Sequence, residues 1–315
     1  MRILITGGAG FLGSHVCELL IARGDSVVCL DDLSSGRYEN IEHLTSSGRF
    51  TFVQGSVLNP IDLPGTFDGV MHLASPASPP EYLQRPVFTL MTGAEGTRHA
   101  LDFAREKGAR LVLASTSEVY GDPEVHPQPE TYWGNVNPVG PRSVYDEAKR
   151  YAEAITMAYR ESEGVDTGIV RIFNTYGPRM RPHDGRAIPT FLRQALEEKP
   201  LTVFGDGSQT RSFCFVDDLV RGLILLAESG EHLPVNIGNP DEYSLLQLAE
   251  TVIDITETDS EIVFEALPVD DPQVRQPDIR LARERLGWEP EISLRDGLKR
   301  TIEESGRDRL IGKTV

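Results

Sequence analysis

Short apolar runs alternate with longer segments of helical periodicity from the start of the chain to about residue 172. The run at residues 2–6 predicts a strand. Leu12, Val16, Leu19 and Leu20 then recur at helical spacing, up to a stop at Gly24. Further strands are predicted at 26–30, 50–54, 69–74, 109–115 and 166–173, and helices at 86–107 and from 145 to about 162. This alternation predicts an α/β fold with a Rossmann-type, doubly wound parallel sheet.

Beyond residue 172 the pattern changes to loops marked by glycine and proline, with shorter helices. We expect a smaller α/β substrate-binding domain there, formed by about 173–211 and 237–305. The segment 212–216 and a helix at 218–229 are predicted to return to the first domain. That domain then comprises 1–172 plus about 212–236, and residues 306–315 form a tail.

A glycine-rich turn, Gly7-Gly8-Ala9-Gly10-Phe11-Leu12-Gly13, connects the first predicted strand to its helix. Glycines let the backbone come close to a pyrophosphate, and the helix N-terminus offers unpaired N–H groups. Asp31 follows the second strand, where a carboxylate would accept hydrogen bonds from an adenosine ribose. Because a carboxylate repels a 2′-phosphate and no arginine follows before Arg37, we expect NAD rather than NADP.

Composition narrows the classes of function. The chain has 315 residues, 39% of them hydrophobic, and a formal net charge of -17, which disfavours nucleic acid as a partner. No apolar run is long enough to span a membrane and no signal-peptide pattern precedes the first strand, so a cytoplasmic location is expected. Three cysteines and seven histidines lack metal-ligand spacing, and we predict no metal.

Candidate chemistry lies in Tyr145-Asp-Glu-Ala-Lys149, downstream of Ser115-Thr-Ser-Glu-Val-Tyr120. On a helix, a spacing of four residues places the phenol and the ammonium on one face, about a turn apart. The cation can then favour the phenolate near neutral pH. We expect Tyr145 to act as a base on a sugar hydroxyl.

The chain resembles the extended short-chain dehydrogenases/reductases, and among them the UDP-glucuronic acid decarboxylases, also called UDP-xylose synthases. The resemblance extends to about Arg300, and its most specific segments are 73–80, 114–127, 132–138 and 270–278. It implies a homodimer, a tightly held NAD that is regenerated in each cycle, and UDP-glucuronate as the substrate.

The chemistry follows from oxidation at C4, which converts the uronate into a β-keto acid whose loss of CO2 gives an enolate. Return of the hydride then gives UDP-xylose. By resemblance, Thr116 bonds O4, Lys149 lowers the tyrosine pKa and bonds the nicotinamide ribose, and Glu118 and Arg275 act around the sugar ring. The other implied substrate contacts are Pro79, Tyr82, Asn174, Phe204 and Arg211, with Arg275 again. The implied cofactor contacts are Gly7, Gly10, Phe11, Leu12, Gly13, Asp31, Asp32, Ser34, Ser35, Gly36, Ser56, Val57, Leu73, Ser75, Thr92, Ala114, Tyr145 and Lys149.

The residues after Thr116 help to distinguish related reactions. Sugar 4,6-dehydratases have Asp-Glu there, and the aspartic acid protonates the departing C6 hydroxyl. This chain has Ser117-Glu118, which suits a C6 that departs as CO2. Simple 4-epimerases usually carry a small or hydroxyl residue in place of Glu118.

Three positions depart from the decarboxylase pattern. Ser56 replaces an acid near adenine, while Met91 and Gly93 replace a lysine and an asparagine, and that lysine lies near substrate in the family. Three hypotheses therefore stay open. They are decarboxylation of UDP-glucuronate, C4 epimerisation of UDP-glucuronate or a related nucleotide sugar, and a non-catalytic NAD-binding sensor or scaffold.

Overall fold

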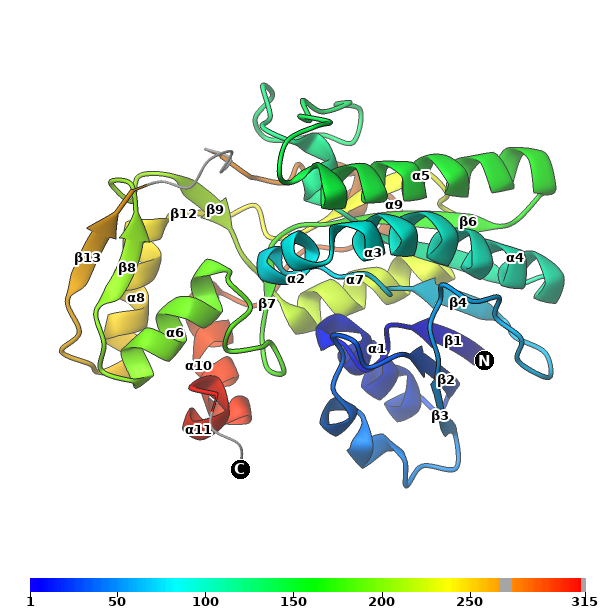
Figure 1. Ribbon diagram of the computed structural model, residues 1–315, viewed down its shortest axis with the longest axis horizontal. Coiled ribbons are helices and arrows are strands. Elements are labelled where there is room, and N and C mark those ends of the chain that lie inside the picture. Colours follow the sequence, from blue (N-terminus) through cyan, green and yellow to red (C-terminus); the bar gives the residue numbers. More distant parts are fainter. Residues whose placement is uncertain (267–273, 313–315) are drawn as a thin grey trace.

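A seven-stranded parallel sheet forms the centre of the molecule in the computed structural model, which describes residues 1–266 and 274–312 (Figure 1). The strand order is β11-β6-β5-β4-β1-β2-β3. The strands are β1 (Arg2–Thr6), β2 (Ser26–Asp31), β3 (Phe50–Gln54), β4 (Gly69–His72), β5 (Arg110–Thr116), β6 (Thr167–Ile172) and β11 (Pro234–Ile237). The predicted doubly wound fold is confirmed, and β11 is the strand of this sheet that the sequence pattern did not reveal.

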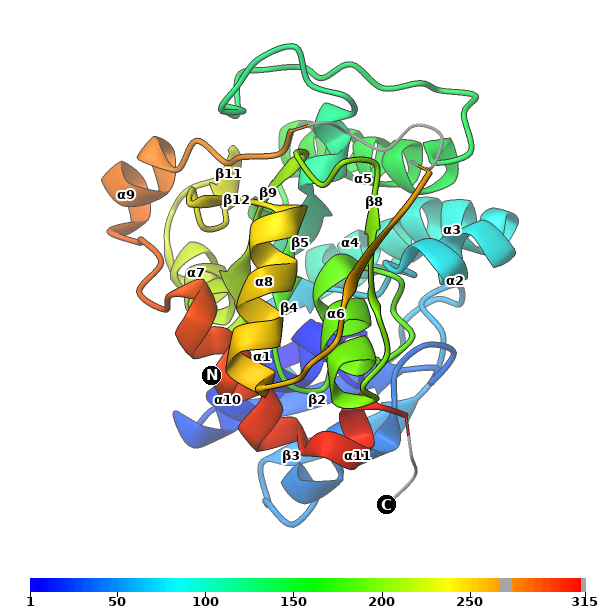
Figure 2. The same ribbon diagram turned by 90° about the vertical axis from the view of Figure 1, so that its left-hand side faces the viewer.

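The strands are apolar on both faces because helices cover the sheet on both sides. In β1, Ile3 and Ile5 pack into one buried cluster with α1 (Phe11–Ala22) and α7 (Val216–Glu228). Leu4 points the other way, into a second cluster with Leu101 and Phe103 of α4 (Thr97–Lys107). Figure 2 shows these two helical layers, with α3, α4 and α5 on one side of the sheet and α1 and α7 on the other.

The helix predicted over 86–107 is divided into three parts. These are α3 (Pro86–Met91), one π-helical turn over Thr92–Gly96, and α4. A Cβ on Gly93 would lie 2.7 Å from the Cβ of Ala148 in α5 (Ser143–Glu163), so glycine allows the π turn to touch α5. This close contact fixes the helix that carries Tyr145 and Lys149.

The second part of the chain lies beside the carboxyl ends of the strands (Figures 1 and 2). Its elements are α6 (Ala187–Leu196), β8 (Leu201–Phe204), β9 (Thr210–Ser212), β12 (Glu242–Ser244), α8 (Leu245–Thr256), β13 (Ile262–Glu265), α10 (Leu294–Ser305) and α11 (Arg307–Leu310). β13 pairs in parallel with β8, and β12 is antiparallel to β9. Figure 2 shows α6 and α8 side by side in front of the sheet.

Residues 212–216 do not form a single element. The chain forms β9, which ends at Ser212, and then β10 (Cys214–Phe215), which pairs with β7 (Thr175–Tyr176). α7 then begins at Val216 and leads into β11, while α9 (Arg280–Leu286) lies farther along the chain. α2 (Pro79–Gln84) completes the described α-helices. No helix in residues 1–266 or 274–312 is long and apolar enough to cross a membrane.

The neighbours of β1 in the sheet indicate where a ligand site is expected. β1 has β2 on one side and β4 on the other, so the chain departs in opposite directions from the middle of the sheet. In open parallel sheets the crevice for a ligand lies at this point, outside the carboxyl ends of the strands. Here the carboxyl ends of β1, β2 and β5 carry Thr6, Asp31 and Thr116.

Candidate active site

A cavity of about 560 Å³ opens at this edge and is lined by both parts of the chain. All but one of the predicted cofactor, substrate and catalytic residues are among its lining residues. Gly36 is the exception, because it lies against the carboxylate of Asp31, where an added Cβ would come within 2.8 Å of Oδ1. The structure therefore brings together residues from 7 to 275 around one cavity.

The glycine turn leaves room and donors for a phosphate group. Gly7 has a φ of +73°, and a Cβ on Gly13 would lie 2.1 Å from the carbonyl oxygen of Gly7. α1 begins after Gly10 with no side chain capping its first N–H groups. Such a helix start favours an anion through its dipole and its free donors.

The carboxylate of Asp31 contacts both the glycine turn and the segment that follows β2. Its Oδ2 accepts from the backbone N–H of Ala9 at 2.9 Å and its Oδ1 from that of Leu33 at 2.8 Å. Burial raises the pKa of Asp31, and these two bonds oppose the rise. The uncapped helix start, the glycine cradle and this carboxylate are the donor and acceptor set that fits NAD.

Tyr145 and Lys149 lie on one face of α5, as their spacing predicts. The Lys149 Nζ donates to the carbonyl of Ala114 at 2.8 Å and lies 5.9 Å from the centre of the Tyr145 ring. The Tyr145 ring is 7% exposed and stacks on Tyr82 with centroids 5.1 Å apart. Both side chains therefore face the cavity from a rigid helix.

The expected lowering of the tyrosine pKa is wrong for this structure. Burial raises the pKa of Tyr145 above its ordinary value, although a hydrogen bond with Thr116 acts in the opposite direction. Burial also lowers the pKa of Lys149 to about 8, with Glu153 opposing. Because the protein removes both groups from water, desolvation outweighs the favourable pairing that the spacing predicts.

Glu118 is fixed between two arginines. Its Oε2 accepts from Arg142 at 2.8 Å, and its Oε1 lies 3.5 Å from Nη1 of Arg275. Burial acts to raise the pKa of Glu118, but Arg275 and then Arg142 outweigh it and hold the pKa at about 2. Arg275, which is 2% exposed, also donates to the Ser117 hydroxyl at 3.2 Å and to the Gly121 carbonyl at 2.8 Å.

Sequence reasoning missed three charged residues near this cluster. Arg142 directly precedes α5, a position that could have marked it, whereas Arg186 lies after a loop with no local signal. Arg186 lines the cavity and is paired with Asp184. The third residue, Asp146, is 6% exposed, and its Oδ1 has no hydrogen-bond partner among the described residues. Burial and then the charge of Glu118 raise the pKa of Asp146 to about 7.

Phe204, Asn174 and Arg211 line the part of the cavity formed by the second half of the chain. The Phe204 side chain is 38% exposed at the end of β8, so it is not a core residue. Arg211 donates to the carbonyl of Thr210 at 2.8 Å. An aromatic face and guanidinium groups in one cavity suit an aromatic base joined to phosphates.

The departures from the decarboxylase pattern have different structural outcomes. Met91 is 42% exposed on α3 and is not among the described residues that line the cavity, so its side chain does not replace a contact there. Gly93 serves the contact between the π turn and α5. Ser56 lines the cavity. Within the motif segment at 270–278, residues 270–273 lie outside the described residues.

Comparison with known proteins agrees with this geometry. A family model described as "NAD dependent epimerase/dehydratase family" matches residues 3–238. The chain is 50% identical over 313 residues to UDP-glucuronic acid decarboxylase 1 of Arabidopsis thaliana, covering 99% of this chain and 71% of that protein.

Solved structures are also similar. The dTDP-glucose 4,6-dehydratase of Streptomyces venezuelae with NAD and TYD bound gives a TM-score of 0.88 at 29% identity, covering 96% of each chain. The UDP-glucuronic acid 4-epimerase of Bacillus cereus, in complex with UDP-glucuronic acid and NAD, gives 0.85 at 29% identity, covering 98% of this chain and 99% of that one. The chain belongs to the NAD-dependent epimerase/dehydratase family of extended short-chain dehydrogenases/reductases, and its cofactor is NAD.

Proposed function

We propose that this chain is a UDP-glucuronate decarboxylase that forms UDP-xylose. The observation that carries the proposal is the ionised Glu118 between Arg142 and Arg275, next to Ser117 rather than an aspartic acid. This cluster has no acid at the position from which a dehydratase protonates a departing hydroxyl. The identity of about 50% to decarboxylases over nearly the whole chain supports the same reaction.

Tyr145 is proposed as the base for the C4 hydroxyl, with Thr116 holding O4 by a hydrogen bond. Since burial favours the neutral phenol, ionisation of Tyr145 requires groups that stabilise the phenolate. Thr116 does so by a hydrogen bond and Arg186 by its charge, and the Lys149 ammonium lies 5.9 Å from the ring centre. Bound NAD supplies the hydride acceptor and later the hydride donor at C4. Thr116 and Tyr145 then stabilise the oxyanion at O4 that forms when CO2 leaves C5.

The charged cluster is proposed to admit the uronate. Two guanidinium groups face one carboxylate, so the cluster is net positive while Asp146 holds its proton. An anionic carboxyl group can therefore enter beside Arg275. With a pKa of about 2, Glu118 stays a carboxylate near neutral pH, and we assign it to orienting Arg275 and the sugar rather than to donating a proton.

Mass spectrometry of the products tests the proposal. The protein is incubated with NAD and UDP-glucuronate, and we expect CO2 and a nucleotide pentose. A new chromatographic peak with the mass of a hexuronate would instead establish the 4-epimerase alternative, because the C4 epimer has the same mass as UDP-glucuronate. Recovery of UDP-glucuronate alone would favour an NAD-binding sensor or scaffold.

A Tyr145→Phe variant tests the catalytic assignment. We expect CO2 release to fall by about 10²–10⁴-fold, the range typical of general acid–base groups. Tyr151→Phe is the matched control, because Tyr151 lies on the same helix and is 47% exposed. Equal rates for Tyr145→Phe and the parent would remove the assignment.

We further propose a homodimer in the cytoplasm. Leu83, Val87, Leu90 and Met91 of α2 and α3 are exposed, and we assign the apolar surface that they provide to the partner copy. Three buried free thiols suit a reducing compartment. The division into an NAD-binding domain (1–172 plus about 212–236), a substrate domain (about 173–211 and 237–305) and a tail at 306–315 is part of the same proposal.

A further inference from the structure

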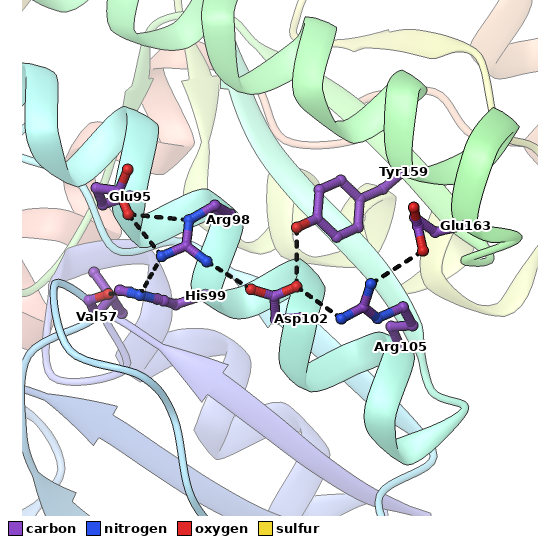
Figure 3. Close-up of polar contacts among 8 residues, drawn as sticks. All are labelled: Val57, Glu95, Arg98, His99, Asp102, Arg105, Tyr159 and Glu163. Atoms are coloured by element: carbon purple, nitrogen blue, oxygen red, sulfur yellow. Dashed lines mark hydrogen bonds and ion pairs between the residues drawn. The ribbon is translucent and has the colours of Figure 1, made fainter.

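A row of polar contacts runs along α4 and α5 (Figure 3), and it begins at Val57, which lines the cavity. At its inner end, Nδ1 of His99 lies 2.8 Å from the carbonyl oxygen of Val57. Nε2 of His99 lies 2.7 Å from Nη2 of Arg98. The His99 side chain is buried, with 7% exposed, so both ring nitrogens are used inside the protein.

The partners of His99 fix its tautomer. A guanidinium group can only donate hydrogen bonds, so Nε2 must accept from Arg98. The ring proton therefore lies on Nδ1, which donates to Val57. Arg98 is itself held by Glu95, at 2.7 Å, and by Asp102, at 2.8 Å.

The outer part of the row holds Asp102. Its Oδ1 accepts from the hydroxyl of Tyr159 at 2.9 Å and lies 3.2 Å from Nη2 of Arg105, which also bonds Glu163 at 3.0 Å. These contacts connect α4 to α5, as Figure 3 shows. Glu95 and Asp102 therefore hold the Arg98 guanidinium in the position from which it donates to Nε2 of His99.

Val57 belongs to the end of the cavity that is remote from Tyr145. Gly55, Ser56 and Val57 follow β3 and line the cavity. In the sheet, β3 lies next to β2, which carries Asp31, on the side away from β1 and its glycine turn. With the pyrophosphate at the turn and the nicotinamide end beside Tyr145, the adenine end falls at Ser56 and Val57. The short segment is held by the N–H of Gly55, which donates to the Asp31 carbonyl at 3.0 Å, and by His99.

We propose that His99 is a positioning residue for the adenine end of NAD, and that Arg98 holds it in the tautomer that this task requires. His99 fixes the backbone of Val57, and the π turn packs on the same residue, since a Cβ on Gly96 would lie 2.7 Å from Cγ2 of Val57. Ser56 offers no carboxylate to the adenine, so adenine binding in this protein depends more on the position of the Val57 backbone.

Binding of NAD and of nicotinamide mononucleotide, which lacks the adenosine, tests the proposal. Equilibrium titrations use the full chain with its cofactor removed. His99→Phe keeps a ring but loses the donor, and we expect NAD to bind about tenfold more weakly, as for one lost buried hydrogen bond, with the mononucleotide unchanged. Arg98→Leu is expected to weaken NAD binding less, in the same direction. The control Arg105→Leu removes the outer ion pair with Glu163 and is expected to change neither affinity.

Equal losses for NAD and the mononucleotide in His99→Phe, or no loss for either, would overturn the proposal. The tautomer gives a second readout that needs no variant. Nitrogen-15 NMR of the histidine side chains is expected to show the Nδ1–H form for His99, and an Nε2–H form would refute the role of Arg98. If His99→Phe does not fold, Arg98→Leu and the tautomer measurement decide the matter.

Discussion

Replacing Asp146 with asparagine is expected to stabilise the protein at alkaline pH much more than at acid pH. Asp146 lies next to Tyr145 on α5, with 6% of its surface exposed. Its carboxyl group faces Glu118, which disfavours its charge, and Arg142 and Arg275, which favour it, with Glu147 and Tyr82 also nearby. Asparagine has a similar shape and does not titrate, so the variant removes the ionisation alone.

The magnitude follows from the two pKa values of Asp146. The folded value of about 7 lies above the ordinary value of 3.8, so the folded state binds the proton more tightly than the unfolded chain does. Stability is therefore lost as the pH rises from about 4 to about 7, and it is constant above that window. At about 1.4 kcal/mol for each pKa unit, the raised pKa of Asp146 lowers the free energy of unfolding by about 2 kcal/mol at about pH 5 and by about 4 kcal/mol at about pH 8.

Urea denaturation of the parent and Asp146→Asn at these two pH values measures the effect. Any change in packing caused by the amide is the same at both, so the difference between the two stability changes isolates the titration. We expect the variant to gain about 2–3 kcal/mol relative to the parent between about pH 5 and about pH 8. The same stability change at both pH values would refute the reasoning and show that Asp146 is ionised throughout.

Two other substitutions test the packing of α3 and α5. Gly93→Ala is expected to lower the free energy of unfolding by about 1–3 kcal/mol in thermal or urea denaturation, because its methyl group would meet Ala148, whereas Gly48→Ala, with no atom within 4 Å, should cost little. Val87→Glu is expected to give monomers in analytical ultracentrifugation, since Val87 is 71% exposed on the apolar surface assigned to a partner copy. Val139→Glu, at a site 91% exposed in the loop before α5, is the control, and an unchanged sedimentation coefficient for Val87→Glu would contradict the assigned surface.

Local patterns predicted the first half of the fold well. The strands that end at Thr6 and Gln54 were found at their predicted bounds, because a buried parallel strand is a short apolar run and glycine or polar residues end it. The π turn at Thr92–Gly96 was not predicted, because its cause is the contact of Gly93 with Ala148, more than 50 residues away. β11 was missed for a similar reason, since it pairs with β6 only after the whole of residues 173–233 has intervened.

The candidate site likewise contains residues that local spacing predicts and residues that only tertiary contacts identify. The residues at Tyr145 and Lys149 were found because a fixed spacing on a helix needs no tertiary information. The direction of the tyrosine pKa was wrong because it depends on burial, which arises from Tyr82 and other distant segments. Asp146 became visible as a site residue only when Glu118 and Arg275, 157 positions apart, lay beside each other.

The position of β1 in the sheet has a consequence for synthesis on the ribosome. β1 emerges first and pairs with β2, which in turn takes β3, so a three-stranded unit can form early. Its apolar edge at β1 stays uncovered until Gly69–His72 are translated, and the sheet is complete only when Ile237 has emerged. The nascent chain therefore has an apolar strand edge without its final partner until β11 has emerged.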